Sequence, residues 1–162
     1  IRDRSYMNIF FPKEPEIEKR VSLTLETAQK FLKLGLKIFI EKSFSEHIGT
    51  SDEDFAALRE KIVSRDEVFL DAHLICSVRN LQEEEIDKIK PSTLLISFLD
   101  PFNEKVLVKK IKEKNISAIS MELVPRITRA QKMDALSSQA NLAGYSSVII
   151  ASQELQLSLI HI

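Results

Sequence analysis

The stretch Ser92-Thr-Leu-Leu-Ile-Ser-Phe-Leu99 is the most hydrophobic run of the chain, and it decides the fold class together with the next 22 residues. Its length and its apolar side chains predict a strand. We expect Asn103 to cap a helix after it, and Ile116–Met121 to form the next strand. A strand, a helix and a strand within about 30 residues indicate a βαβ unit with parallel strands.

The same alternation continues toward the N-terminus. Short apolar runs predict three earlier strands, and Pro12 ends the first of them. Capping residues and amphipathic spacing predict three further helices between and after these strands. We therefore expect an α/β fold with a mostly parallel sheet of about five strands flanked by helices. The three strands are Asn8–Phe11, Lys37–Glu41 and His73–Val78; the helices run from Thr24 to Gly35, from Ser51 to Leu58 and from about Glu83 to Ile89.

The helix after Asn103 has one apolar side and one basic side. Helical spacing places its apolar residues toward the sheet and its lysines toward solvent. The residues expected to point inward are Val106, Leu107 and Ile111, and those expected to point outward are Lys109, Lys110, Lys112 and Lys114.

Composition excludes several classes of protein. The 162 residues carry 23 Lys and Arg against 24 Asp and Glu, so no strong positive field favours nucleic acid. A single cysteine, Cys76, excludes an internal disulfide and a cysteine-based zinc site, and we expect it to be buried and inert. The three histidines are scattered, so no metal site is expected; His47 is assigned to the surface and His73 to the edge of the core.

Only three glycines are present, and they cannot form a G-x-G-x-x-G or Walker-type phosphate loop. No apolar run approaches the ~18 residues that a membrane-spanning helix needs. Residues 1–6 and 157–162 lack any structural pattern, and we expect these ends to be foreign to the native protein. The remaining chain divides into a first α/β subdomain at 7–124 and a site-bearing segment at 125–154.

The segment Pro125–Tyr145 has features that a plain surface helix does not need. Pro125 keeps the preceding residue extended, and a helix is expected from about Ala130. On that helix Gln131, Asp134 and Ser138 share one polar face with Ser137 beside it.

Simpler interpretations of these residues stay open. Thr128 and Gln131 have the spacing of a capping box, and Asp134 could pair with Arg126 or Arg129 at the surface. Five charged residues after the first strand would normally form a solvated loop. They are Lys13, Glu14, Glu16, Glu18 and Arg20.

Three stretches closely resemble the alpha subunit of the proton-translocating NAD(P) transhydrogenases. They are Phe11–Thr24 (F-P-K-E-P-E-I-E-K-R-V-S-L-T), Thr93–Asn103 (T-L-L-I-S-F-L-D-P-F-N) and Arg126–Tyr145 (R-I-T-R-A-Q-K-M-D-A-L-S-S-Q-A-N-L-A-G-Y). The resemblance covers residues 7 to about 154. Leu25 stands where the family usually has proline, and Thr128 replaces the commoner serine.

The resemblance implies a Rossmann-like first subdomain that ends in a long connecting helix. It also implies an NAD(H)-binding component that exchanges hydride with NADP(H) held on a partner domain, coupled to proton translocation by a membrane domain. The glycine-rich loop would lie in a second subdomain outside this sequence. The residues implied to contact the nicotinamide end of NAD(H) are Arg126, Ile127, Thr128, Gln131, Asp134 and Ser137, with Gln131 and Asp134 in the catalytic role.

The resemblance further implies a homodimer on the cytoplasmic face of a bacterial inner membrane, or on the matrix side in an organelle, attached through its partners. This fragment by itself is expected to be inactive. Alanine dehydrogenase has a similar architecture, but its strand-end lysine and catalytic histidine are absent where this chain has Arg79 and Asp100. An alanine dehydrogenase-like enzyme and a non-catalytic α/β dimerisation module remain as alternatives.

Overall fold

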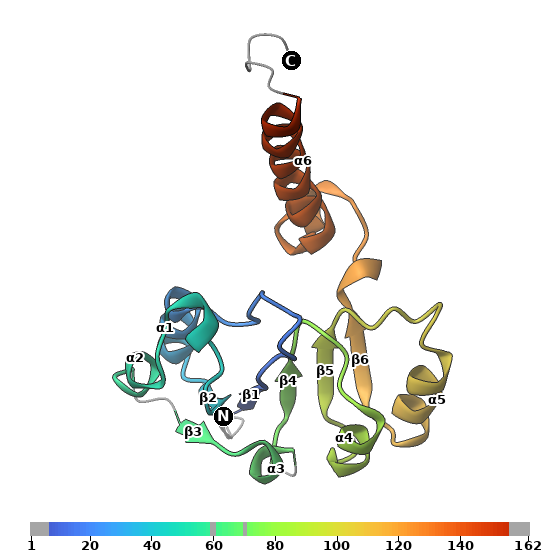
Figure 1. Ribbon diagram of the computed structural model, residues 1–162. Helices are drawn as coiled ribbons and strands as arrows, with labels where there is room; N and C mark the ends of the chain where they lie inside the picture. Colours follow the sequence, from blue (N-terminus) through green and yellow to red (C-terminus); the bar gives the residue numbers. More distant parts are fainter. Residues whose placement is uncertain (1–6, 59–60, 70, 156–162) are drawn as a thin grey trace. The chain divides into compact units, whose positions relative to one another are not determined.

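A computed structural model describes residues 7–58, 61–69 and 71–155, so the two terminal segments expected to be non-native lie outside the described residues. Six parallel strands form one sheet in the order β3-β2-β1-β4-β5-β6 (Figure 1). The expected α/β fold is therefore confirmed, with one more strand than the sequence predicted. The strands are β1 Asn8–Phe11, β2 Lys37–Glu41, β3 Lys61–Val63, β4 Leu74–Cys76, β5 Leu94–Ser97 and β6 Ser117–Ser120.

Helices connect and cover these strands (Figure 1). The α-helices are α1 Leu25–Lys33, α2 Asp52–Ala56, α3 Arg65–Val68, α4 Glu83–Lys88, α5 Lys105–Glu113 and α6 Ala135–Glu154. Three short 3₁₀ helices are η1 Glu46–Ile48, η2 Met121–Leu123 and η3 Thr128–Met133.

The strand that the sequence did not predict is β3, at one edge of the sheet. It has three residues and pairs only with β2, where Ile62 aligns with Ile40. A run of Lys-Ile-Val is too short to show the alternation that identifies a strand. The expected strand His73–Val78 is also shorter in the structure, because only Leu74–Cys76 pair regularly with the neighbouring strands.

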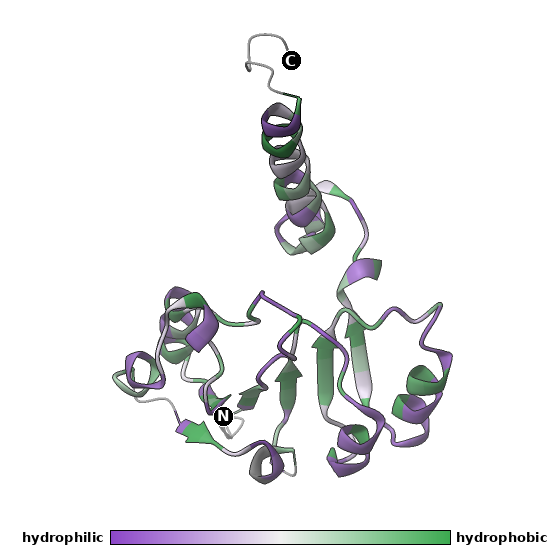
Figure 2. Ribbon diagram, viewed as in Figure 1, coloured by the Kyte–Doolittle hydropathy of each residue, from purple (hydrophilic) through white to green (hydrophobic). Residues whose placement is uncertain are grey.

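Each face of the sheet has its own hydrophobic core. On one face, Ala28 of α1 and Phe55 of α2 pack with Ile9, Ile38 and Ile40. On the other face, α4 and α5 cover Phe10, Ile75 and Leu95 through Ile86, Leu107 and Ile111. The centre of the sheet is accordingly apolar, while the helices are polar on their outer sides (Figure 2).

Local capping explains where the early helices begin and end. The Thr24 hydroxyl accepts the Thr27 backbone N–H, and Ser51 forms a reciprocal capping box with Asp54. Gly35, with φ of +79°, follows the end of α1 in the left-handed conformation that favours glycine. These three expectations are confirmed.

Two expectations about α5 are wrong. Glu104, not Asn103, precedes the helix, and the Asn103 amide instead donates to the Asp100 carboxylate. Val106 is 65% exposed, because the helix turns only Leu107 and Ile111 fully toward the sheet. Of the four lysines, Lys110 and Lys114 are half-buried, and both pair with Asp87.

The order of the strands creates a switch point between β1 and β4. The chain leaves β1 toward β2 and β3 on one side, and returns through α3 to β4 on the other. In open parallel sheets the carboxyl ends of the strands at such a point flank a crevice that commonly binds ligands.

The chain separates into two compact units, the first ending at Ser120 and the second beginning at Met121. The second unit contains η2, η3 and α6. The twenty residues of α6 include no buried side chain, although Leu142, Tyr145, Ile149 and Ile150 are large and apolar. Within the described part of the chain, no helix combines the length and the apolar character needed to cross a membrane.

Candidate functional site

A pocket of about 310 Å³ lies within the second unit. The chain builds it from the turn after Pro125, from η3 and from the start of α6. Six residues line it, and they are the six that the sequence resemblance implied: Arg126, Ile127, Thr128, Gln131, Asp134 and Ser137.

The local backbone differs from the expected single helix. A 3₁₀ helix ends at Met133, and a separate α-helix begins after Asp134, so the predicted start at Ala130 is wrong. Gln131 therefore does not share a helical face with Asp134 and Ser138, whereas the Ser138 hydroxyl donates to the Asp134 carbonyl at 3.2 Å. The bend at Asp134, where ψ is 83°, is what brings Gln131 and Ser137 to the same pocket.

Asp134 is the N-cap of α6. One carboxylate oxygen accepts the Ser137 backbone N–H at 2.9 Å, and the other accepts the Ser137 hydroxyl at 2.6 Å. These bonds lower the pKa of the Asp134 carboxyl, with a smaller contribution from the positive charge of Arg126. No ion pair joins Asp134 to Arg126 or Arg129 among the described residues, so the surface-pair interpretation is not supported.

Gln131 is not part of a capping box. The residue before η3 is Ile127, and no side chain caps that helix, so the alternative based on Thr128 and Gln131 is wrong. Gln131 and Arg126 are both exposed. Their amide and guanidinium groups can therefore donate to a molecule in the pocket.

The donor set of this pocket fits the nicotinamide end of a dinucleotide. Arg126 offers a planar cation that can donate to a carbonyl or to ribose oxygens. Because the Ser137 hydroxyl donates its hydrogen to Asp134, its remaining lone pairs can accept from an amide N–H. Ile127 is 56% exposed and supplies an apolar surface for an aromatic ring.

Replacing Asp134 separates its capping role from any role in binding. We expect Asp134→Ala to lower hydrogen-exchange protection of the Ser137 and Ser138 amides roughly fivefold, because the cap at the start of α6 is lost. Asp134→Asn is the control, since asparagine caps helices about as well as aspartate. Equal protection in the alanine variant and the unmodified chain would show that the cap does not hold this turn.

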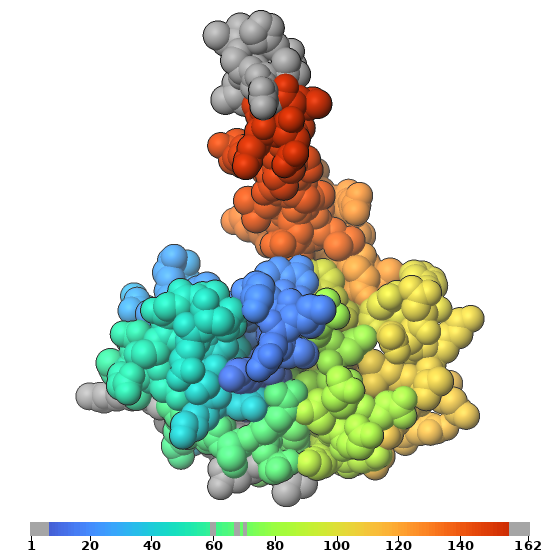
Figure 3. Space-filling model, in the orientation of Figure 1, coloured from blue at the N-terminus to red at the C-terminus, as the bar shows by residue number. Residues whose placement is uncertain are grey.

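A second polar cluster lies at the carboxyl ends of β1 and β4, where the sequence predicted no site. Glu14 and Glu18 are each only 7% exposed, so the expected solvated loop is wrong for these two residues. The segment after β1 reaches the surface between residues near 40 and residues near 80 (Figure 3). Charge composition alone suggested a loop in water, because the backbone groups that bind Glu14 are more than 60 residues away in sequence.

Hydrogen bonds satisfy both buried carboxylates, those of Glu14 and Glu18. Glu14 accepts the backbone N–H groups of Val78 at 2.5 Å and Arg79 at 3.0 Å, yet burial raises the pKa of its carboxyl. Hydrogen bonds from Arg20 hold the pKa of Glu18 at about 2, and Arg79 lies 3.4 Å from the same carboxylate. The Arg20 guanidinium also lies over the ring of Phe98, 5.4 Å from its centroid.

The remaining candidate residues behave as structural groups. Cys76 is half-buried rather than fully buried, and desolvation raises the pKa of its thiol to about 12, so it stays protonated and unreactive. His73 accepts the backbone N–H of Asn8 at the start of β1, but it is exposed, so its expected place at the edge of the core is wrong. His47 is exposed, as expected. Among the described residues no group of histidine, cysteine and acidic side chains is placed to hold a metal ion.

Comparison with known proteins places these features in a family. Residues 10–143 match the family described as "Alanine dehydrogenase/PNT, N-terminal domain". Because the match covers most of the chain, this protein belongs to that family.

Two relatives show which members of this family the chain resembles. The chain is 40% identical over 147 residues to the NAD(P) transhydrogenase subunit alpha of Cereibacter sphaeroides, which covers 90% of this chain and 28% of that protein. It is 38% identical over 139 residues to the NAD(P) transhydrogenase subunit alpha of Haemophilus influenzae, covering 86% of this chain and 27% of the relative. The chain thus spans less than a third of the length of these two relatives.

A solved structure gives the same relationship. The transhydrogenase of Sinorhizobium meliloti has a TM-score of 0.84 and 32% identity to this chain, covering 91% of it and 44% of that protein.

The alanine dehydrogenase of Methanococcus maripaludis, compared by sequence, is more distant at 30% identity over 152 residues, covering 93% of this chain and 40% of the relative. The predicted resemblance to transhydrogenase alpha subunits is therefore confirmed.

Proposed function

We propose that this protein is the N-terminal portion of the NAD(H)-binding component of an NAD(P) transhydrogenase. The observation that carries the proposal is the pocket of the second unit, whose six lining residues are those implied by the resemblance. Similarity to transhydrogenase alpha subunits over 86–90% of the chain supports it. The reaction is NADH + NADP⁺ ⇌ NAD⁺ + NADPH, with proton translocation by a membrane domain.

Within this proposal the chain positions the nicotinamide end of NAD(H). The bound dinucleotide supplies the hydride chemistry, so the protein needs to orient it and exclude competing geometries. Arg126, Thr128 and Ser137 hold the carboxamide and the ribose, while Ile127 contacts the ring. Asp134 fixes Ser137 and the start of α6, and Gln131 reaches toward the second nucleotide.

The proposed partners follow from the same assignment. NADP(H) is held by a partner domain, and the pyrophosphate of NAD(H) is held by a second subdomain with a glycine-rich loop. We propose a homodimer that is peripheral to the membrane, on the cytoplasmic or matrix side. The exposed apolar side chains of α6 supply a surface that such partners would cover.

A chimera tests the function directly. The aligned segment of this chain would replace the segment that it matches, over 147 residues, in the Cereibacter sphaeroides subunit alpha, and the product would be assembled with its partner subunits. We expect NADH-dependent reduction of NADP⁺, because the six pocket residues are retained. A well-folded, assembled chimera with no hydride transfer would contradict the proposal.

Two further measurements test the proposed function against an alanine dehydrogenase-like activity and test the need for the second subdomain. Alanine-dependent formation of NADH by the chimera would favour the alanine dehydrogenase interpretation. The 162-residue chain alone is expected to bind NADH far more weakly than the chimera, because helix-face contacts without a glycine-rich loop hold a dinucleotide poorly. Micromolar binding by the isolated chain in a fluorescence titration would contradict this expectation.

A further inference from the structure

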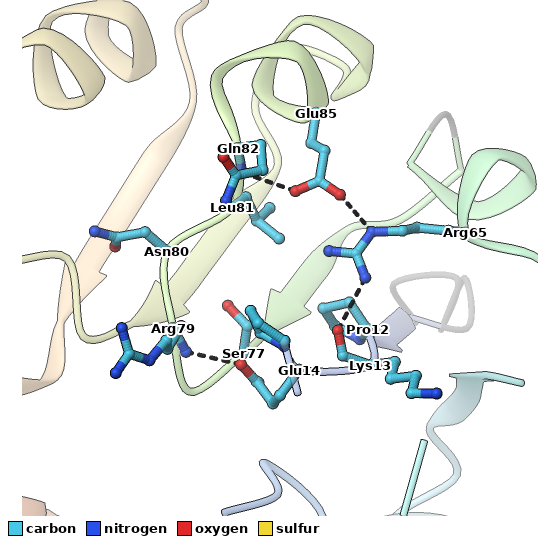
Figure 4. Close-up of a pocket in the computed structure, with 11 residues that line it drawn as sticks. Pro12, Lys13, Glu14, Arg65, Ser77, Arg79, Asn80, Leu81, Gln82 and Glu85 are labelled. Carbon is cyan, nitrogen blue, oxygen red and sulfur yellow. Dashed lines mark hydrogen bonds and ion pairs between the residues drawn. The ribbon is translucent and has the colours of Figure 1, made fainter. Parts of the chain in front are cut away.

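A pocket of about 170 Å³ opens at the carboxyl ends of β1 and β4, within the first unit, and none of its lining residues belongs to the site proposed for NAD(H). Its walls come from Pro12–Pro15, from Arg65 and from the connection between β4 and α4 (Figure 4). The volume corresponds to about six water molecules at their share of the liquid volume. A molecule of about six non-hydrogen atoms would therefore fill it.

The carboxylates that line this pocket already accept hydrogen bonds, and one of them pairs with Arg65. Glu14 accepts two backbone N–H groups, and Glu85 accepts the Gln82 N–H at 2.7 Å as well as an Arg65 N–H. Arg65 donates in addition to Glu41 at 2.8 Å and to the Lys13 carbonyl at 2.9 Å. The Lys13 side chain points away from Ser77 in Figure 4. An anion would face Glu14 and Glu85, and a cation would face Arg65 and Arg79, so neither charge is favoured.

Two neutral groups of the pocket lack a partner. Ser77 is only 7% exposed, and its hydroxyl has no hydrogen-bond partner within the described structure. The side-chain oxygen of Asn80 is likewise buried there without a donor. Such buried groups are rarely left unsatisfied, because each carries a desolvation cost. A hydroxyl both donates and accepts, and it is best satisfied by another neutral group that does the same.

The next two strands of the sheet carry further buried hydroxyl groups without a hydrogen-bond partner in the described structure. Continuing the register of β4 and β5 by one residue places Ser77 beside Ser97, and Ser97 aligns with Ser120 of β6. The hydroxyls of Ser97 and Ser120 are also buried without a partner in the described structure. Three neighbouring strands therefore end in the same type of neutral hydrogen-bonding group.

From these observations we propose that the pocket beside Ser77 binds a small, neutral, polyhydroxylated molecule of about the size of glycerol. One hydroxyl of the ligand exchanges hydrogen bonds with Ser77. The others lie against the Arg65 and Glu85 side of the pocket, where charged groups can both donate and accept.

Glycerol titrations of the ¹⁵N-labelled 162-residue chain, followed by the amide signals of Val78 to Gln82, test this proposal. We expect saturable shifts with a millimolar dissociation constant for glycerol, and weaker binding of 1-propanol and acetate. Shifts that grow linearly without saturation, or equal binding of 1-propanol, would overturn it.

Matched variants identify the group responsible. Ser77→Ala should weaken glycerol binding about two- to tenfold through loss of one hydrogen bond. Ser77→Thr keeps the hydroxyl but adds a methyl group to a small pocket, and it should weaken binding as well. Ser22→Ala is the control, because the Ser22 hydroxyl is also buried without a partner in the described structure and does not line this pocket. Unchanged binding in both Ser77 variants would overturn the proposal.

Discussion

Arg65→Ala is expected to cost about 2–4 kcal/mol of unfolding free energy, which is among the largest effects of a single substitution away from the apolar core. Arg65 joins three segments: it donates to Glu41 at the end of β2, to Glu85 in α4 and to the Lys13 carbonyl after β1. The side chains of Glu41 and Glu85 are only 16% and 14% exposed, so alanine would leave two desolvated carboxylates without their cation. Chemical denaturation monitored by circular dichroism measures the loss.

Controls distinguish this network from ordinary surface pairs. Lys30→Ala breaks the exposed pair with Glu26 on α1 and should not change stability measurably, because both groups are well solvated. Arg65→Ala combined with Glu85→Gln should be less destabilising than the sum of the single changes, since one unpaired charge is removed. Equal stability of the Arg65→Ala and Lys30→Ala variants would show that Arg65 is not a structural link.

The parallel sheet was predictable because its signals are local. Each central strand is a run of apolar residues, and the helix starts at Thr24 and Ser51 carry their capping partners within three residues. β3 escaped prediction because three residues hold too little periodicity, and its strand character depends on pairing with β2. The error at Val106 arises because successive helix residues point about 100° apart, so with Leu107 and Ile111 against the sheet Val106 is turned away from it.

The residues of the two candidate sites also differ in whether their partners are close in sequence. The residues of the 125–137 segment lie close together in sequence, so a local motif could identify them, although the break at Asp134 was not visible in the pattern. The cluster of Glu14, Glu18 and Arg79 is different, because its long-range hydrogen bonds join segments that only the sheet brings together. Sequence spacing could not distinguish these buried carboxylates from a solvated charged loop.

Gln131→Asn in the chimera should slow hydride transfer on the order of 100-fold while changing NADH affinity little. This expectation rests on the proposed function, in which the Gln131 amide lies between the bound nicotinamide and the second nucleotide. Shortening the side chain by one methylene withdraws the amide by about 1 Å, which is enough to misplace donor and acceptor. Stopped-flow measurement of hydride transfer gives the rate, and fluorescence titration gives the affinity.

Stability is the readout that separates this role from a structural one. No side chain caps η3, and Gln131 is exposed, so the Asn variant should melt at the temperature of the unmodified chimera. Thr128→Ser is the matched control at the other end of η3, because it keeps the hydroxyl in the pocket, and it should retain both rate and stability. A lowered melting temperature with unchanged hydride transfer would assign Gln131 to the structure of the turn. A side chain that positions the two nucleotides would instead change the rate of hydride transfer and leave the melting temperature unchanged.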